Sequence, residues 1–523
     1  MFDILIKNGT VIDGTGQPMF QADIGIREDK IVQVGQLHNE KGEIEIDATD
    51  KLVCPGFIDV NNHSDTYWRI FNNPDLESLV YQGITTIVGG NCGSSLAPLA
   101  DSETIASIQK WSNIKQVNVN WLTMPDFFEA VSNSKLSVNF ATLVGHGTLR
   151  RGILKDQMRA PNPKEMAFIE KMLANALSSG ALGMSSGLVY THARTTTKEE
   201  LVALAKIVKK YNGVYATHIR DEIDNFQEAL KEAIEVARES KVKLHISHFK
   251  IIGEKNWDMM DEAMFLIGKA KEDGIDITFD VYPYTNTGTV LYTLLPAWVT
   301  DGGRKMMLNR LKDKSIRPRI IREMKKSGFD FSKVEIAISA LDKTLDKRNI
   351  TDIAKSQEKS IEDAILDVLI ASEGRVITSM EVLSQGNVNQ AIAHPLSFVA
   401  TNGAGYNLEH AKTGEQVHPR SFGSFVKVLS KYVIGEKIIN WEEAIMKMTS
   451  FPASKFGLKQ RGVIKKDYFA DIVVMNRDEL KDFATVDNPY QYSRGMEFVL
   501  VNGKIVLSEG KYAGVRNGKV LKK

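Results

Sequence analysis

The chain has 523 residues, of which 43% are hydrophobic and 25% are charged, and its formal net charge at pH 7 is +1. This length suits one large barrel with an accessory domain, and the balanced charge argues against nucleic acid or an acidic membrane surface as a partner. Two cysteines, Cys54 and Cys92, are too few for a disulfide scaffold. The sequence opens without a secretory signal pattern, and no run of about 18 apolar residues predicts a membrane span. We therefore expect a cytoplasmic protein.

Short β-strands are predicted at both ends of the chain. Runs rich in Val and Ile alternate with Gly-containing turns in DILIKNGTVIDGTG, ADIGIREDKIVQVG and IEIDATDKLVCPG. The same pattern returns in RGVIKKDYFADIVVMN and MEFVLVNGKIVLSEGKYAGV. We expect residues 1–58 and 451–523 to combine into one small β-sandwich domain.

Between these ends, residues 59–450 alternate strand-like and helix-like segments. Apolar residues recur at helical spacing in TKEELVALAKIVKKYN and NFQEALKEAIEVARESK, and strand–helix alternation predicts a parallel sheet. Eight strand candidates favour a closed (β/α)8 barrel of the TIM type. They are PGFIDVNNH, TTIVGGNCG, NFATLVGH, ALGMSSGL, VYATHIR, KLHISHFK, DITFDVYPY and SFVATNGAG, with RVITSM as a spare candidate.

Residues 287 to about 350 interrupt this alternation with a mostly helical, basic segment, which includes LLPAWVTDGGRKMMLNRLKDKSIRPRIIREMKKSG. Barrels of this kind carry their functional loops at the carboxyl ends of the strands. We therefore expect an insertion on the functional rim of the barrel.

Residues with metal-binding chemistry follow several of the predicted strands. Cys92 follows the second strand, His218 the fifth and His248 the sixth, and the carboxyl ends of parallel barrel strands meet at one mouth. Zinc favours thiolate and imidazole ligands, commonly in tetrahedral sites. These three residues would leave a fourth position for water, whose pKa zinc lowers to about 7. Each residue alone is more often structural, and we expect this of His245, on the opposite side of the His248 strand.

An ordered set of motifs runs over nearly all of the chain, and each of them is weak alone. They are ILIKNGTVIDGTG, PGFID, VGGNCGSSLAPL, GHGTLRRGIL, GALGMSSGLVY, THIRDE, SHFK, DVYPYTNTGTVLYTLLPAW, HPLSFVATNGAG, HPRSFGSF, ADIVVMN and VNGKIV. Taken in this order, they resemble the motifs of the N-acyl-D-amino-acid deacylases (D-aminoacylases) of the amidohydrolase superfamily. The resemblance implies a β/α barrel, a small β domain from both termini, and zinc-dependent hydrolysis of the linear amide of an N-acyl-D-amino acid. The partner would be this small molecule, and the oligomeric state stays open.

The family's metal centre is only partly kept. The resemblance assigns the tightly held zinc to the Cys, His and His named above. A second, weaker site would use a His-x-His pair and an Asp, and those positions read Asn61, His63 and Asn402 here. Asn is a poor zinc ligand, and its amide has no basic group in the useful pH range. We therefore expect one Zn²⁺, with the second site lost.

Other positions match residues that the family uses around its substrate. Tyr190, Lys250 and Tyr282 match contacts to the acylated amino acid, and Arg150 and the HPR at 418–420 match motifs of less certain role. An ammonium group suits an anion, so Lys250 could pair with a substrate carboxylate, although a structural salt bridge is an equal alternative.

Three functions are compatible with these substitutions. A mononuclear zinc amide hydrolase would need a substitute base, for which His63, Asp65 and His192 are candidates, while Asn402 could hydrogen-bond water or substrate. A diverged enzyme could instead carry out amide formation, cyclisation or isomerisation on an acyl-amino acid, where a water-activating base would be a liability. A non-catalytic binding protein is the third reading, against which the kept substrate-contact residues count.

Overall fold

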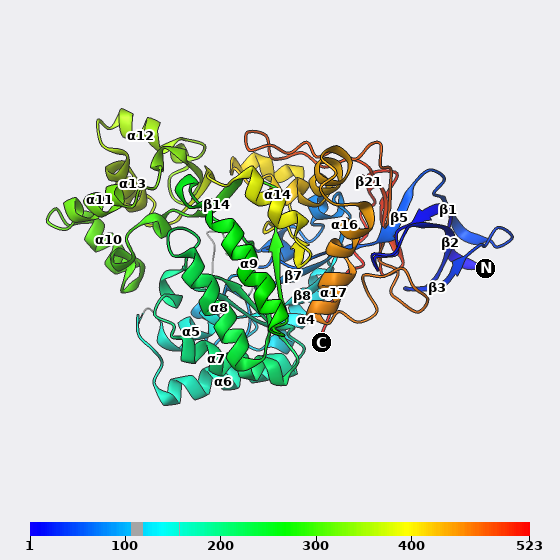
Figure 1. The fold of residues 1–523 in the computed structure, drawn as a ribbon, viewed down its shortest axis with the longest axis horizontal. Coiled ribbons are helices and arrows are strands. Elements are labelled where there is room, and N and C mark those ends of the chain that lie inside the picture. The colour runs from blue at the N-terminus through cyan, green and yellow to red at the C-terminus, as the bar shows by residue number, and fades with distance from the viewer. Residues whose placement is uncertain (106–118, 156) are drawn as a thin grey trace.

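A closed β/α barrel forms the centre of the computed structural model, which describes residues 1–105, 119–155 and 157–523 (Figure 1). Its parallel strands form two hydrogen-bonded sets, and only Leu143 separates β8 from β9. A parallel bridge from Asn62 to Gly403 links the ends of β6 and β17. The strands are β6 (Phe57–Asp59), β7 (Ile84–Gly89), β8 (Asn139–Thr142), β9 (Val144–Gly145), β10 (Gly183–Gly187), β11 (Val214–His218), β12 (Lys243–Ile246), β13 (Ile277–Val281) and β17 (Ser397–Val399). With β8 and β9 as one interrupted strand, the described residues give the eight-stranded barrel that the sequence predicts.

Amphipathic helices cover the outside of the barrel (Figure 1). In α7 (Lys198–Lys210), Leu201, Leu204 and Val208 recur at helical spacing and are buried. The Thr197 hydroxyl caps this helix by accepting a hydrogen bond from the Glu200 amide. Further covering helices are α6 (Pro163–Ser178), α8 (Phe226–Ser240), α9 (Met259–Glu272), α14 (Gln385–Ala393), α16 (Trp441–Met448) and α17 (Ser450–Phe456).

Strands from both ends of the chain form one sheet beside the barrel (Figure 1). Among the described residues the sheet has nine strands, in the order β21–β20–β19–β18–β5–β1–β2–β3, with β4 paired to β1. Antiparallel pairing of β5 with β18, where Val53 faces Val474, joins the two halves. Ile4, Ile24 and Leu500 belong to the core that the halves share. The strands are β1 (Phe2–Val11), β2 (Phe20–Arg27), β3 (Lys30–Gly35), β4 (Gly42–Asp47), β5 (Leu52–Pro55), β18 (Ile472–Met475), β19 (Met496–Val501), β20 (Lys504–Ser508) and β21 (Lys511–Tyr512).

The insertion is longer than the sequence suggests. It contains an antiparallel sheet in which β16 (Val376–Glu381) lies between β14 (Asn286–Val290) and β15 (Val334–Ser339). RVITSM is therefore an insertion strand and not a barrel strand, and the insertion continues past residue 350 to Glu381. Its helices surround a separate hydrophobic core. They are α10 (Gly303–Lys312), α11 (Arg317–Lys326), α12 (Ile350–Ser356) and α13 (Ile361–Ala371).

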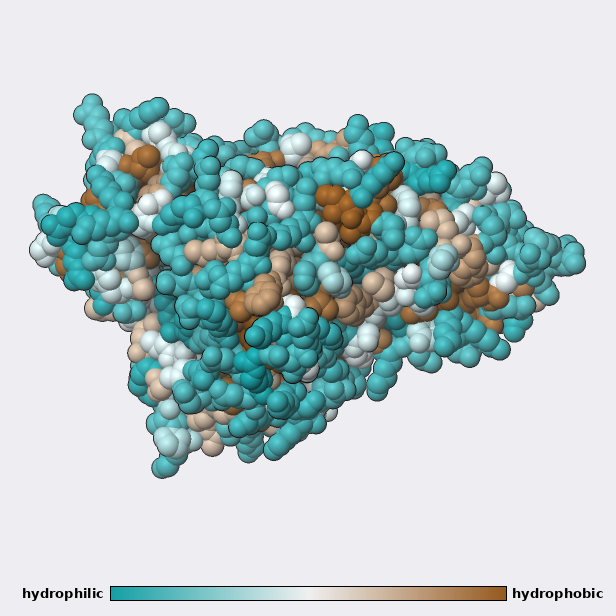
Figure 2. Space-filling view, in the orientation of Figure 1, coloured by the Kyte–Doolittle hydropathy of each residue, from teal (hydrophilic) through white to brown (hydrophobic). Residues whose placement is uncertain are grey.

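Hydrophilic residues cover most of the molecular face in Figure 2, with small hydrophobic patches between them. Within the described segments, no helix combines the length and apolar character needed to cross a bilayer.

Candidate functional site

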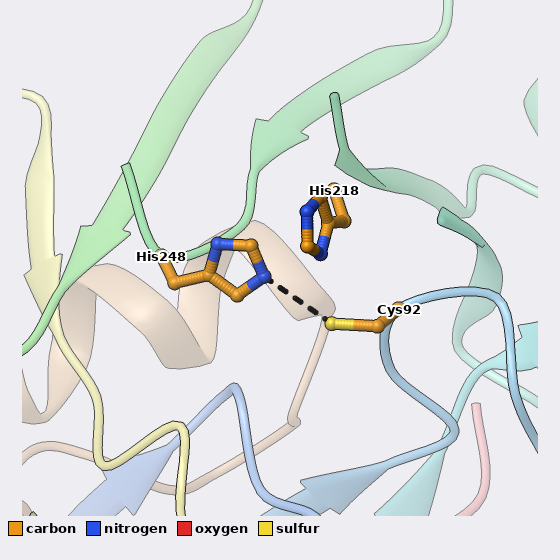
Figure 3. Close-up of side chains that lie close together, drawn as sticks. All are labelled: Cys92, His218 and His248. Atoms are coloured by element: carbon orange, nitrogen blue, oxygen red, sulfur yellow. Dashed lines mark hydrogen bonds between the residues drawn. The ribbon is translucent and has the colours of Figure 1, made fainter. Parts of the chain in front are cut away.

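Three metal-ligating side chains meet at the carboxyl ends of the barrel strands (Figure 3). Cys92 follows β7, His218 ends β11 and His248 follows β12. Their candidate ligand atoms all lie within 4.8 Å of one another, and Cys92 Sγ is 3.3 Å from His248 Nε2. All three side chains are buried. One sulfur and two imidazole nitrogens match the donor preference of zinc.

Three residues around this cluster have backbone conformations that residues other than glycine rarely adopt. Cys92 (φ 52°), His248 (φ 38°) and Asn402 (φ 45°) all have left-handed backbone angles. Each such residue costs roughly 1–3 kcal/mol, and such strain concentrates at functional sites. The loop after β7 is fixed by Asp65, whose Oδ2 accepts a hydrogen bond of 2.7 Å from the Gly90 amide.

Asp65, a candidate substitute base from the sequence, is engaged with the backbone. Its two oxygens accept from the backbone amides of Thr66 and Gly90, and it does not line the cavity described below. A carboxylate that accepts backbone hydrogen bonds holds a loop in place. We assign Asp65 a positioning role for the Cys92 loop.

Glu222 is a site residue that the sequence reasoning missed. Its Oε1 lies 3.1 Å from His248 Nδ1 and its Oε2 lies 3.4 Å from His218 Nε2. For His248 this leaves Nε2 for a metal, the usual arrangement in which a carboxylate orients a ligating histidine, while Glu222 lies at ion-pair distance from His218. Four-residue spacing from His218 in THIRDE was the available signal.

Electrostatics favour ligand-competent forms of these side chains. Burial acts to raise the pKa of Glu222, but the positive charge of Lys250 holds this pKa well below the usual range. Burial, followed by the Lys250 charge, lowers the pKa of His248 to about 3. A neutral imidazole is the form that binds a metal.

Lys250 is already engaged within the protein. Its Nζ lies 2.5 Å from Glu222 Oε1 and 3.0 Å from His248 Nδ1. The structural salt bridge, one of the two alternatives for Lys250, is thus formed. Lys250 still lines the cavity, but its charge is balanced by Glu222. A free positive charge was the reason to expect Lys250 to bind the substrate carboxylate, and this pairing weakens that expectation.

The substituted second-metal positions form hydrogen bonds of their own. His63 Nε2 lies 2.9 Å from Asn402 Oδ1 and 3.9 Å from Cys92 Sγ. Asn61 points its amide NH2 at Asp280, with 3.2 Å to each carboxylate oxygen. Asp280 also lies 2.9 Å from His245 Nε2, which gives His245 a structural partner.

Two residues expected near substrate lie elsewhere. Arg150 is buried in an ion pair with Glu200 and donates to the His192 carbonyl oxygen, and neither Arg150 nor His192 lines the cavity. Arg150 has its acceptors inside the protein, and the His192 imidazole lies beside the Gly93 carbonyl oxygen and outside the cavity lining. Burial also lowers the pKa of His192 well below the usual range.

The two tyrosines differ in position. Tyr190 lines the cavity, with its ring centroid 5.3 Å from that of His218. Tyr282 donates its hydroxyl to Thr287 at the start of the insertion, 2.9 Å away, and does not line the cavity. Tyr282 therefore links the barrel to the insertion through this hydrogen bond.

One cavity at the barrel mouth connects the cluster with the insertion. His63, Tyr190 and Arg420 line its barrel side, and Val290, Leu294 and Ile338 line its insertion side. The Nε and Nη1 atoms of Arg420 are buried and have no hydrogen-bond acceptor within the described residues. Its guanidinium lies 4.9 Å from the Tyr282 ring centroid. A buried guanidinium without an acceptor is suited to binding an anionic ligand.

The chain is similar to deacylases over its whole length. Residues 45–364 and 406–507 match the model of the Amidohydrolase family. The D-aminoacylase of Alcaligenes xylosoxydans xylosoxydans is 31% identical over 520 residues, which cover 99% of this chain and 97% of the relative. A crystal structure of N-acyl-D-glutamate deacylase from Bordetella bronchiseptica, complexed with zinc and a phosphonate mimic of the tetrahedral intermediate, has a TM-score of 0.84 at 29% identity, covering 100% of both chains. A D-aminoacylase structure that concerns one-metal activation and second-metal attenuation has a TM-score of 0.85 at 30% identity, with the same coverage.

Proposed function

We propose that this chain, which belongs to the amidohydrolase family, hydrolyses the linear amide bond of N-acyl-D-amino acids with one zinc ion. The observation that carries the proposal is the buried Cys92–His218–His248 cluster, which faces a cavity with an imidazole and a guanidinium. The choice of substrate class and of D configuration comes from the similar deacylases.

The donor set fits one zinc better than two. A thiolate and two imidazoles leave a fourth position for water, as catalytic zinc sites do. When bound, zinc would supply hydroxide near neutral pH and polarise the amide carbonyl. Asn61 and Asn402 carry amides in place of the imidazole and carboxylate that a second site would need. Both amides are also engaged in hydrogen bonds, Asn61 with Asp280 and Asn402 with His63. The similar D-aminoacylase, whose structure concerns a binuclear centre with one-metal activation and second-metal attenuation, supports activity with a single metal.

His63 is the side chain best placed to move a proton in the cavity. The Asn402 carbonyl oxygen can only accept, so it selects the His63 tautomer with a proton on Nε2. Imidazole is the commonest general acid and base, and once His63 has taken up a proton at Nδ1 it could give the Nε2 proton to a leaving amine. Because Asn402 itself cannot accept a proton, we expect slow hydrolysis compared with an aspartate at this position.

Arg420 is the proposed anchor for the substrate carboxylate. Arg420 lines the cavity and has two buried nitrogens without an acceptor, whereas the Lys250 ammonium is paired with Glu222. A guanidinium binds a carboxylate through two parallel hydrogen bonds, which also fixes the direction of the substrate. Val290, Leu294 and Ile338 would then contact the acyl group or the side chain of the amino acid.

Non-hydrolytic chemistry on the same substrate class is the second candidate. The observation that favours it is Asn402, whose amide lines the cavity but supplies no base. Amide formation or isomerisation would use the same polarised carbonyl without a need to deprotonate water.

The test is a screen of zinc-loaded protein with N-acetyl, N-succinyl and long-chain N-acyl forms of D-amino acids, with the L enantiomers as matched controls. We expect release of free D-amino acid, and loss of this release in Cys92→Ala. If no D-amino acid is released by the wild type or by Asn402→Asp, while either enantiomer is consumed to another product, the second candidate replaces the first.

A further inference from the structure

The geometry points to Asn402 as a site of self-modification. We propose that the cavity hydrolyses the side-chain amide of Asn402 and so converts this residue to aspartate. The inference rests on the proposed function, because it requires a cavity that hydrolyses amides. Its consequence is that the chain would produce after folding the carboxylate that its sequence lacks.

The side chain of Asn402 is held as a substrate amide would be. Its carbonyl oxygen lies 2.9 Å from His63 Nε2, and a donated hydrogen bond polarises the carbonyl toward attack at carbon. Its NH2 group makes no hydrogen bond to any described residue, so the leaving group is not tied to the protein. Asn402 lines the same cavity as Cys92, and its backbone is held at φ 45°.

The reaction needs only water as a co-reactant. The water oxygen forms a bond to Cγ of Asn402, and the Cγ–Nδ2 bond breaks. The nitrogen leaves with its electron pair and takes up both protons of the attacking water, so that it departs as ammonium and the side chain is left as a carboxylate. The product carboxylate keeps its hydrogen bond from His63, which becomes charge-assisted and therefore stronger. No group in the cavity has to move to accommodate the product.

A second chemical route to the same change exists for any Asn-Gly pair, and the structure disfavours it at Asn402. In that route the following amide nitrogen attacks the side chain and forms a cyclic imide, which opens to a mixture of aspartate and isoaspartate. The Gly403 amide donates to Thr401 Oγ1 (3.0 Å), and the Gly403 carbonyl accepts from the His63 amide (2.7 Å). Gly403 is therefore held by hydrogen bonds at its amide and at its carbonyl, which restrains the attacking nitrogen, and attack by water gives ordinary aspartate only.

The chain carries its own controls for the experiment. Other Asn-Gly pairs begin at Asn8, Asn212, Asn502 and Asn517. Asn212 is exposed and lies outside the cavity, so it can react only by the imide route. Its conversion should not depend on zinc and should yield isoaspartate as the main product.

The test follows each Asn-Gly pair by peptide mass spectrometry that separates aspartate from isoaspartate. Full-length protein is purified with a chelator, split, and incubated with or without one equivalent of zinc. We expect Asn402 to become aspartate only with zinc, with release of equimolar ammonia and no isoaspartate. Because Cys92→Ala could misfold, the chelated wild type serves as the primary negative control.

Two results would overturn the inference. One is an Asn402 amide that persists in zinc-loaded protein, and the other is conversion that matches Asn212 in rate, product mixture and indifference to zinc. Hydrolysis of N-acyl-D-amino acids is measured in the same samples. If substrate is hydrolysed while Asn402 stays an amide, only this inference fails. If neither the wild type nor Asn402→Asp hydrolyses substrate, the proposed function fails.

Discussion

Replacing Asn402 with aspartate should increase amide hydrolysis strongly. In the structure the Asn402 carbonyl oxygen lies 2.9 Å from His63 Nε2, and an aspartate oxygen fits the same place. The carboxylate could accept a proton that the amide cannot. A positioned general base typically contributes about 10²–10⁴-fold in rate, which corresponds to about 2.7–5.4 kcal/mol in the activation free energy.

The assay measures kcat and kcat/KM for release of free D-amino acid over a pH series, with zinc added at the start of each reaction. Mass spectrometry first establishes that residue 402 of the wild-type sample is still an amide. Asn162→Asp is the matched control. Asn162 caps α6 away from the cavity, and asparagine and aspartate are about equally good helix caps. We expect the Asn402→Asp variant to gain a low-pH limb that reports ionisation of the new carboxyl. Equal rates for the amide-bearing wild type, Asn402→Asp and Asn402→Ala would refute the reasoning.

Three further changes test separate parts of the site. Glu222→Gln should weaken zinc binding by about 10–100-fold in a chelator competition, because Glu222 lies beside both histidine ligands. The control Glu228→Gln, on the exposed face of α8, should leave the zinc affinity unchanged. Equal zinc affinities of the two variants would show that Glu222 does not position the ligands. Arg420→Met should raise KM far more than it lowers kcat, with exposed Arg322→Met as control, and a fall in kcat alone would contradict a binding role. Zinc at 100 times its Kd should stabilise the fold by about 2.7 kcal/mol in thermal unfolding, and an unchanged Tm would mean that no native-state site exists.

The barrel was predictable because most of its strands are short runs rich in apolar residues that end in turn or polar residues, and helical segments alternate with them. The end of the insertion was not predictable in the same way. Helices Ile350–Ser356 and Ile361–Ala371, followed by strand Val376–Glu381, repeat the rhythm of a barrel unit. Only the antiparallel pairing of that strand with β14 and β15 assigns it to the insertion.

The metal cluster was predictable for a geometric reason, and its surroundings were not. Strand ends of a parallel barrel converge, so Cys92, His218 and His248 could be grouped from chain order alone. Hydrogen-bond direction is invisible in a sequence. Asp65 was therefore a plausible base until its oxygens proved to accept backbone amides, and Glu222 was passed over although it contacts both histidines.

The central claim is a single zinc site built by one thiolate and two imidazoles. Its most direct test is zinc per chain by elemental analysis, on protein purified without added metal and again after zinc is supplied and excess removed. We expect about one zinc per chain, lost in Cys92→Ala and kept in Asn61→Ala. Two zinc ions per chain, or none after zinc is supplied, would contradict it.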